Sequence, residues 1–374
     1  MQAFQCACGQ PLFFANLVCL GCGSEVAYDP RRRLLGPLSP RGDGVWAFQG
    51  DAREPTPLFR LCAHRAAAAA CNWLVPAEDP VAFCLSCSLT RTIPALDRPR
   101  NAERLRDLEA AKRRVLFSLQ NLKLPIVSKT HDPEGLAFDF LESLPDAPPV
   151  LSGHAAGVIT LNVAEADGDY RDKHRDLLQE HYRTVIGHLR HELGHYYWDV
   201  LVRDTSWQES FRALFGDERA DYGQALERYY AEGPPADWQS RFISRYAAAH
   251  PWEDWAETWA QYLHIRSTLE TVTAYKLDIS QTPLKATPFG PDALFMPEPA
   301  EAGAAFLAWI NVMVVLAAVL NETARSMGQP DTYPFVLNRP TVTKLHFVHC
   351  VISGNRAART PPPPEALAVA VAAG

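Results

Sequence analysis

Two histidines and a glutamate in the stretch GHLRHELGHYYWD (187–199) have the types and the spacing that zinc chemistry uses. His191 and His195 are four residues apart, so on a helix they would face the same side and could bind one ion. Glu192 lies beside them, within reach of a water molecule on that ion. Two imidazoles leave zinc short of ligands, because a catalytic site takes a third protein ligand and a water. The motif also fits an ordinary buried helix, so its meaning depends on what the rest of the chain supplies.

The segment HPWEDWAETWA (250–260) carries the best candidates for a third ligand. Glu253 and Glu257 are one helical turn apart among tryptophans, where a carboxylate is costly to bury without a partner. A metal ion and a metal-binding histidine would be such partners. We therefore predict that Glu253 binds the zinc directly. Glu257 would accept the N–H from the far nitrogen of His191 and so fix the tautomer of that histidine.

Other polar residues near these motifs have simpler explanations. An alternative third ligand lies in the acidic cluster of the segment FGDERADY, which consists of Asp217, Glu218 and Asp221. Helix capping and salt bridges with Arg219 are the simpler interpretation of this cluster. His188, one turn before His191, fits a surface or supporting histidine better than a fourth ligand. His250, next to Pro251, is expected to order the turn before its helix.

Eight of the nine cysteines lie before residue 90, in two sets of four. Each set contains a CxxC pair, and four thiolates complete the tetrahedral shell of a structural zinc. Such closed shells would hold together a region with little apolar core of its own. The first set is Cys6, Cys8, Cys19 and Cys22, and the second is Cys62, Cys71, Cys84 and Cys87. Buried free thiols are the alternative, which is the interpretation we adopt for Cys350.

The composition limits the classes of protein that the chain can belong to. Its 374 residues are 47% hydrophobic and 21% charged, as in soluble globular proteins. A formal net charge of −7 argues against a general binder of nucleic acid or membrane surfaces. The N-terminus does not read as a signal peptide, and the longest apolar stretch, 304–320, is shorter than the ~20 residues of a membrane span. We therefore expect a cytoplasmic protein whose cysteines stay reduced and free to bind metal.

The hydrophobic pattern predicts the elements that must position these residues. A long helix at 172–202 would carry the HExxH motif, and a helix at 251–275 would carry the two glutamates. Further helices are expected at 102–122, 210–233 with a break near Gly216, 302–327 and 340–353, with strands at 136–141 and 157–163. This is an α+β, mostly helical domain with a small sheet behind a zinc-ribbon module. The expected domains are a zinc-ribbon region at 1–97, a metallopeptidase domain at 98–353 and a disordered Pro/Ala-rich tail at 354–374.

The spacing of these motifs resembles that of the gluzincin metallopeptidases, especially their lethal-factor-like branch. HELGH at 191–195 is followed by Tyr246, by Glu253 seven residues later and by Glu257 four residues beyond. The resemblance implies that Glu253 is the third ligand, that Glu257 is its outer partner and that Tyr246 donates to the substrate carbonyl. More closely, the chain resembles bacterial zinc-binding metallopeptidases with an N-terminal zinc ribbon, through CNWLVP (71–76), FRALFGDERADY (211–222) and HPWEDWAETWAQYLH (250–264). That likeness implies a zincin-like fold up to about residue 353.

These features together predict a zinc-dependent peptidase with one catalytic and two structural zinc ions. Glu192 would act as general base on the zinc-activated water, while zinc and Tyr246 would stabilise the oxyanion. The substrate would be a peptide or protein, and by analogy with zincins the strand at 157–163 would be an edge strand that pairs with it. The ribbons could recruit a protein partner, whereas no membrane and no nucleic-acid partner is expected.

The alternative is a zinc-ribbon scaffold or protein-binding module in which the HExxH zinc is structural or inactive. The feature that separates the two hypotheses is Glu192, because a structural zinc site has no use for a glutamate at that position. Its presence together with Tyr246 favours the enzyme.

Overall fold

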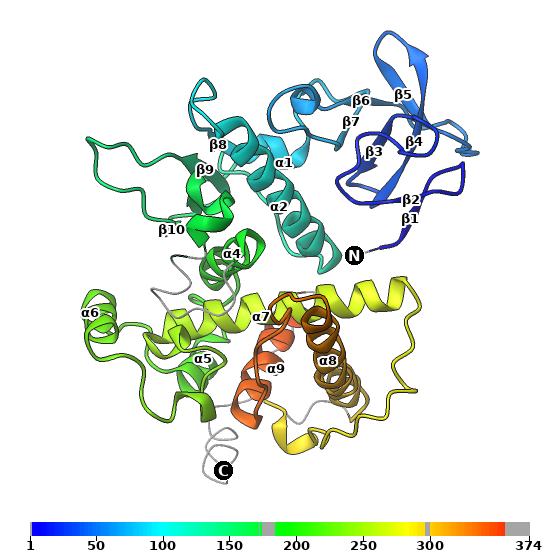
Figure 1. Cartoon of the computed structure of the whole chain (residues 1–374). Helices are drawn as coiled ribbons and strands as arrows, with labels where there is room; N and C mark the ends of the chain where they lie inside the picture. Colours follow the sequence, from blue (N-terminus) through cyan, green and yellow to red (C-terminus); the bar gives the residue numbers. More distant parts are fainter. Residues whose placement is uncertain (1, 172, 174–183, 296–299, 356–374) are drawn as a thin grey trace. The chain divides into compact units, whose positions relative to one another are not determined.

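The computed structural model describes residues 2–171, 173, 184–295 and 300–355. The chain forms two compact units, Met1–Arg171 and Asp172–Gly374. The first unit contains both cysteine sets and every strand found in the described part of the chain, whereas the second is helical and contains the HExxH motif. Figure 1 labels the helices and strands of both units. The tail predicted at 354–374 lies almost wholly outside the described residues.

A five-stranded antiparallel sheet forms much of the N-terminal half of the first unit. Its strands follow one another in chain order: β3 (Val26–Asp29), β4 (Leu34–Gly42), β5 (Val45–Phe48), β6 (Phe59–Leu61) and β7 (Leu74–Pro76). A two-stranded ribbon, β1 (Phe4–Gln5) and β2 (Pro11–Leu12), precedes it. The apolar cluster under this sheet is small and consists of Ala27, Leu38, Phe48, Phe59 and Leu74. Phe14, Tyr28 and Trp73 form a further buried aromatic group with Phe117 of the same unit, and the two thiolate sets can add cross-links to this core.

A second sheet of four strands occupies the rest of the first unit, in the order β10 (Gly153–Ala155), β11 (Val158–Asn162), β9 (Ala137–Leu141) and β8 (Thr90–Thr92). Strand β9 runs parallel to both β8 and β11, and β10 folds back antiparallel on β11. The prediction of an edge strand at 157–163 was therefore wrong. Ala156 and Gly157 both have positive φ, at 47° and 80°, so they form a tight hairpin turn that places β10 over the outer side of β11.

The connection between the expected zinc-ribbon region and the rest of the chain is structured. Strand β8 falls within residues 1–97, yet it pairs with β9. It is followed by the 21-residue helix α2 (Asn101–Asn121), and a short helix, α1 (Leu85–Ser88), precedes it. The two predicted regions thus share a sheet, and the domain boundaries at 97 and 353 remain predictions.

Six helices make up most of the second unit within the residues that the structure describes. They are α4 (Val185–Leu201), α5 (Gln208–Phe215), α6 (Tyr222–Glu232), α7 (Pro251–Ala274), α8 (Ala300–Ser326) and α9 (Arg339–Gly354). Of the helix predicted at 172–202, residues 172 and 174–183 lie outside the described residues, and α4 begins at Val185, where Thr184 is extended and its Oγ1 accepts a hydrogen bond from Gly187 N at 3.0 Å. The predicted break near Gly216 is confirmed, with φ of 105° at that glycine.

Helices α4 and α7 pack closely along each other at Gly194. A Cβ atom added at Gly194 would lie 2.9 Å from the Cα of Ala256. In the same contact, Trp255 Nε1 donates to the Gly194 carbonyl oxygen at 2.8 Å, and the rings of Tyr197 and Trp259 stack at 5.0 Å. The glycine of HELGH is thus required by the approach of two backbones, and this approach brings the motif to the glutamates of α7.

Helix α8 extends beyond the apolar stretch from which it was predicted. Among the described helices, its segment Gly303–Ser326 is long and apolar enough to cross a membrane by length and composition alone. Only 39% of its most apolar window is buried, although Phe306, Ile310 and Met313 lie in the core. The helix therefore has one face in the core and one face that the described residues of the second unit leave uncovered.

Candidate metal centre

Three side chains from two helices meet in the second unit. His191 and His195 lie on α4 and Glu253 lies in the first turn of α7, and one ligand atom from each is within 4.8 Å of the other two. Glu253 Oε2 is 3.0 Å from His191 Nε2, and Oε1 is 3.5 Å from His195 Nε2. All three residues are buried. The arrangement offers two imidazole nitrogens and one carboxylate oxygen around a single point, which is a donor set that zinc accepts.

The electrostatics of this group favour a bound cation. Burial raises the pKa of Glu253, but the charge of His195 and the contacts with His191 outweigh it, and the pKa lies well below its ordinary value. Burial lowers the pKa of His191, but Glu253 and Glu257 outweigh it and the pKa is raised well above 6.5. Glu253 Oε2 is buried and makes no hydrogen bond, although Nε2 of His191 is close. A buried carboxylate oxygen in that state fits a metal ion better than a proton on the histidine.

Glu257 contacts the far side of His191. Its Oε1 is 2.7 Å from Nδ1 of that histidine, and it lies one helical turn after Glu253. If Nδ1 carries the proton and donates to Glu257, the lone pair of Nε2 is left for an ion. The contact predicted between Glu257 and His191 is thus present, and the role of Glu257 at a metal ion stays a prediction.

Glu192 is buried next to the histidine pair and contacts His188, which was expected to be a surface or supporting histidine. Its Oε1 is 3.2 Å from Nε2 of the half-buried His188, four residues earlier on α4. Burial raises the pKa of Glu192, but the hydrogen bond with His188 and the nearby histidines outweigh it, so the pKa is lowered. We read Glu192 as an ionised carboxylate, as a general base requires. The i to i+4 spacing of HLRHE was the available signal for this contact.

Tyr246 lies beside the same group. It begins a short 3-10 helix, η4 (Tyr246–Ala248), and its ring centre is 5.9 Å from that of His191. Burial, together with the charge of Glu253, raises the pKa of the Tyr246 phenol well above 10. The side chain therefore keeps its O–H at neutral pH and is a hydrogen-bond donor.

The acidic cluster that was the alternative third ligand has other partners. The Glu218 carboxylate accepts hydrogen bonds from Arg212 Nε at 3.0 and 3.1 Å. Asp217 forms an ion pair with Arg219 at 2.7 Å, and Asp221 accepts from the Gln224 N–H at 2.9 Å and so caps α6. The cluster stays outside the group formed by the two histidines and Glu253.

Tyr222, the residue that follows this cluster, is the site contact that the sequence-based reasoning missed. Its hydroxyl donates to Glu253 Oε1 at 2.7 Å. It lies 27 residues after His195 and 31 before Glu253, so no helical spacing connects it with either. Its place in the site depends on the path of the intervening loop, and spacing in the sequence does not reveal that path.

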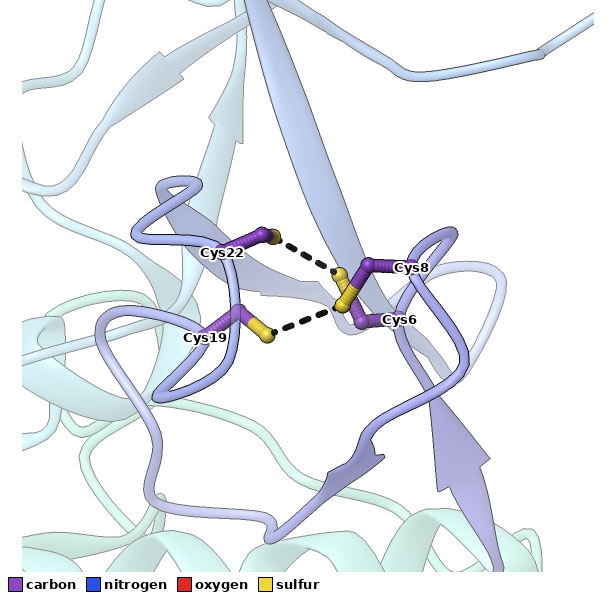
Figure 2. Close-up of side chains that lie close together, drawn as sticks. All are labelled: Cys6, Cys8, Cys19 and Cys22. Atoms are coloured by element: carbon purple, nitrogen blue, oxygen red, sulfur yellow. Dashed lines mark hydrogen bonds between the residues drawn. The ribbon is translucent and has the colours of Figure 1, made fainter.

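The first cysteine set forms a compact group of sulfurs, which Figure 2 shows from two loops that face each other. Sγ of Cys6 is 3.7 Å from that of Cys22, and Sγ of Cys8 is 3.6 Å from that of Cys19. Zinc–sulfur bonds of ~2.3 Å in a tetrahedron place sulfurs ~3.8 Å apart. The observed separations are therefore those of a four-thiolate zinc site. Cys8 and Cys22 are exposed, so this site lies at the surface of the first unit.

The second cysteine set is fully buried. Cys71 Sγ is 3.5 Å from Cys84 Sγ, and the backbone N–H of Cys84 donates to Cys62 Sγ at 3.4 Å. Arg113 of α2 donates to the Ala69 carbonyl oxygen at 3.2 Å, in the loop that leads to Cys71. The contact with Cys62 raises the pKa of the Cys71 thiol, but the contacts with Cys84 and Cys87, together with the charge of Arg113, outweigh it and the pKa is lowered. This site is thus attached to α2 as well as to its own loops.

Comparisons with known proteins agree with both parts of this description. Residues 101–351 match the family described as "Putative zinc-binding metallo-peptidase", and residues 3–98 match a zinc-ribbon domain. The uncharacterized protein Rv2568c of Mycobacterium tuberculosis (strain ATCC 25618 / H37Rv) is 41% identical over 355 residues, which cover 94% of this chain and 95% of the relative. The uncharacterized protein Mb2598c of Mycobacterium bovis shows the same identity and coverage. No solved structure matches the chain significantly. The chain belongs to this family of zinc-binding metallopeptidases and carries its zinc ribbon at the N-terminal end.

Proposed function

We propose that the protein is a zinc-dependent peptidase of the gluzincin type, with Glu192 as its general base. The observation that carries the proposal is the convergence of His191, His195 and Glu253, with Glu192 buried directly beside them. Family membership supports peptidase activity in general, and this geometry supports the finer assignment. The proposed fold of the peptidase part is zincin-like.

Each residue of the centre has a separate task in this proposal. A zinc ion held by the two histidines and Glu253 would lower the pKa of a water molecule and polarise the substrate carbonyl. Glu192, held by His188, takes the proton of that water and later gives it to the leaving amine. Tyr246 donates its O–H to the oxygen that becomes negative in the transition state. Glu257 keeps the His191 ring in one tautomer and one orientation.

The rest of the proposal concerns the other metals and the surroundings of the protein. Both cysteine sets would hold structural zinc, which gives three zinc ions per chain together with the catalytic one. Their ribbon would bind a protein partner or present the substrate. We propose a cytoplasmic location, where the thiols stay reduced.

The substitution Glu192→Gln tests the central assignment. It keeps the size of the side chain and leaves the three ligands in place, so zinc should stay bound while hydrolysis falls by orders of magnitude. The measurement is the cleavage of a proteome-derived peptide library by zinc-loaded protein, together with the zinc content of the same sample. Glu209→Gln, an exposed position on α5, is the matched control and should cleave like the wild type.

Two results would contradict the proposal in different ways. Unchanged cleavage by the Glu192→Gln variant would show that another group acts as the base. Zinc-loaded wild type that cleaves no peptide in the library would favour the scaffold hypothesis, in which the zinc at HExxH is structural.

A further inference from the structure

We propose that Tyr222 is a positioning residue of the metal centre: it holds Oε1 of Glu253, so that this carboxylate presents only Oε2 to the ion. The inference rests on the proposed function insofar as the two histidines and Glu253 bind zinc. It adds a residue outside the HExxH and glutamate motifs, and it assigns different tasks to the two oxygens of one ligand.

The two oxygens of Glu253 have different surroundings. Oε1 accepts the Tyr222 hydroxyl at 2.7 Å. Oε2 is buried, makes no hydrogen bond and lies 3.0 Å from Nε2 of His191. Because Nδ1 of the same ring contacts Glu257, Nε2 is the nitrogen that remains for an ion. Both oxygens lie near a histidine nitrogen, since Oε1 is also 3.5 Å from Nε2 of His195, but only Oε1 is held by a neutral donor.

The loop before Tyr222 is built to fix its position. Gly216 has a φ of 105°, and a Cβ there would approach Pro251 Cγ at 3.0 Å, so the loop passes close to the start of α7. The Arg212–Glu218 ion pair closes the loop on α5, and Asp221 caps the helix that Tyr222 begins. Tyr222 is thus the first residue of a capped helix, and the loop that leads to it is held by the ion pair with α5 and by the Asp221 cap.

His250 connects this loop with the helix that carries Glu253. Its Nδ1 accepts from the Trp252 N–H at 3.1 Å and caps α7. Because Nδ1 is the acceptor, the proton resides on Nε2, which donates to the Ala220 carbonyl oxygen at 3.1 Å. His250 therefore fixes the start of α7, three residues before Glu253. It also holds the backbone at Ala220, two residues before Tyr222. The same ring packs edge-on against Tyr222, with centres 5.2 Å apart.

The consequence concerns the number of atoms that bind the ion. A catalytic zinc keeps a position open when three protein atoms bind it, and a carboxylate that bound through both oxygens would fill that position. By holding Oε1, the Tyr222 hydroxyl keeps Glu253 a one-oxygen ligand. Loss of the hydroxyl leaves Oε1 buried without a partner, so the carboxylate would turn and either bind through both oxygens or hold the ion less well.

The test is Tyr222→Phe, which removes one oxygen atom and keeps the ring packing. Ribbon zinc is left in place, and the catalytic position is emptied with a mild chelator and reloaded with zinc or cobalt(II). We expect zinc affinity, measured by competition with a chromophoric chelator, to fall on the order of 10–100-fold, as for other groups that orient a ligand. The cobalt difference spectrum should also become weaker and shift to shorter wavelength, as happens when a coordination shell gains an atom. Tyr230→Phe, on the same helix and 58% exposed, is the matched control and should change neither readout.

The outcomes separate this inference from the proposed function. Wild-type affinity together with a wild-type cobalt spectrum in Tyr222→Phe overturns the role of Tyr222, whatever the activity. If Tyr222→Phe lowers affinity as expected while the wild type cleaves no peptide, the positioning role stands and the peptidase proposal fails. If His191→Ala leaves the exchangeable zinc in place, the ion binds elsewhere, and both fail together.

Discussion

At the scale of single residues, the two glutamates of α7 show how one helical turn separates two tasks. Glu253 is 1% exposed and faces the Nε2 atoms of both histidines, whereas Glu257 is 19% exposed and faces only Nδ1 of His191. A carboxylate that is enclosed in this way needs a cation to stabilise its ionised form. One that lies behind a histidine acts on the ion only through that ring.

This difference predicts unequal losses on substitution. Glu253→Ala removes a ligand atom and should abolish binding at the exchangeable zinc position. Glu257→Ala should lower zinc affinity less, by ~10–100-fold, because it removes only the group that orients His191. Zinc content after dialysis against a graded zinc buffer measures both.

Tyr246→Phe provides the matched comparison for these two variants. It should keep the zinc affinity of the wild type and lower kcat, because the hydroxyl is proposed to stabilise the developing negative charge and is not a ligand of the ion. Equal zinc loss in Glu253→Ala and Glu257→Ala would contradict the division of tasks. Zinc loss in Tyr246→Phe would show that this tyrosine supports the ligands instead.

The residues that sequence spacing could and could not predict differ in a physical way. His191, His195, Glu253 and Glu257 lie at i to i+4 spacing within two helices, and this periodicity brings each pair to one face. The structure also brings the two pairs together. Tyr222 reaches the same point from a loop whose path depends on a positive-φ glycine, an ion pair and a histidine cap. Such a path has no period, so the sequence does not reveal it.

At the scale of elements, the site depends on how closely α4 approaches α7. The helices carry different halves of the site, and at Gly194 the backbone of α4 lies directly against that of α7 at Ala256. The neighbouring Trp255 spans the same contact with its indole N–H. The distance between the histidines and Glu253 is therefore set by a residue without a side chain.

This contact predicts that Gly194→Ala damages the metal site although the substitution replaces no ligand. The added methyl group would have to push α7 away by part of an ångström, because its nearest atom is the Ala256 Cα at 2.9 Å. We expect lower thermal stability, with a loss of about 1–3 kcal/mol as for other overpacked contacts, and weaker zinc binding. Calorimetry and zinc titration measure the two effects.

Gly223→Ala on α6 is the control for helix propensity. A Cβ there meets only Asp221 Oδ1, at 3.5 Å, which is an ordinary contact. That variant should be as stable as the wild type or slightly more stable, since alanine favours a helix. Wild-type zinc affinity in Gly194→Ala would show that the helix spacing does not set the ligand distances.

Elements as a whole were easier to predict than their ends and neighbours. The periodic helix at 251–275 forms as expected, with Pro251 in its first turn. Helix α4, which carries the HExxH motif, begins at Val185 after the Thr184 cap, and the predicted residues 172 and 174–183 lie outside the described residues. The strand at 157–163 forms, but its neighbour β10 was missed, since a three-residue strand leaves no detectable alternation.

At the scale of the whole molecule, the three candidate metal positions differ in how they are enclosed. The histidine centre offers three protein ligands, and the two cysteine sets offer four thiols each. Of the cysteine sets, the first has two exposed members, whereas the second is buried and is attached to α2 through Arg113. An ion with an open shell and nitrogen or oxygen ligands exchanges more readily than one enclosed by thiolates.

These differences predict both the number of ions and the order in which they leave. Metal analysis of zinc-replete protein should give about three zinc ions per chain. A mild chelator should remove the histidine-bound ion first and leave the fold intact. Stronger chelation should then empty the exposed cysteine set before the buried one. Time-resolved zinc release with a colorimetric chelator measures the order.

Two cysteine variants identify the ions in this sequence. Cys8→Ser should weaken the zinc that leaves second, with a small change in Tm, because that site lies at the surface of the first unit. Cys71→Ser should remove the most slowly released ion and lower Tm further. The loop at Ala69, which Arg113 of α2 contacts, would lose the buried metal site that holds it. One zinc ion or fewer per chain would remove the ribbon interpretation. Equal Tm losses in the two variants would show that the buried site contributes no more to the first unit than the exposed one does.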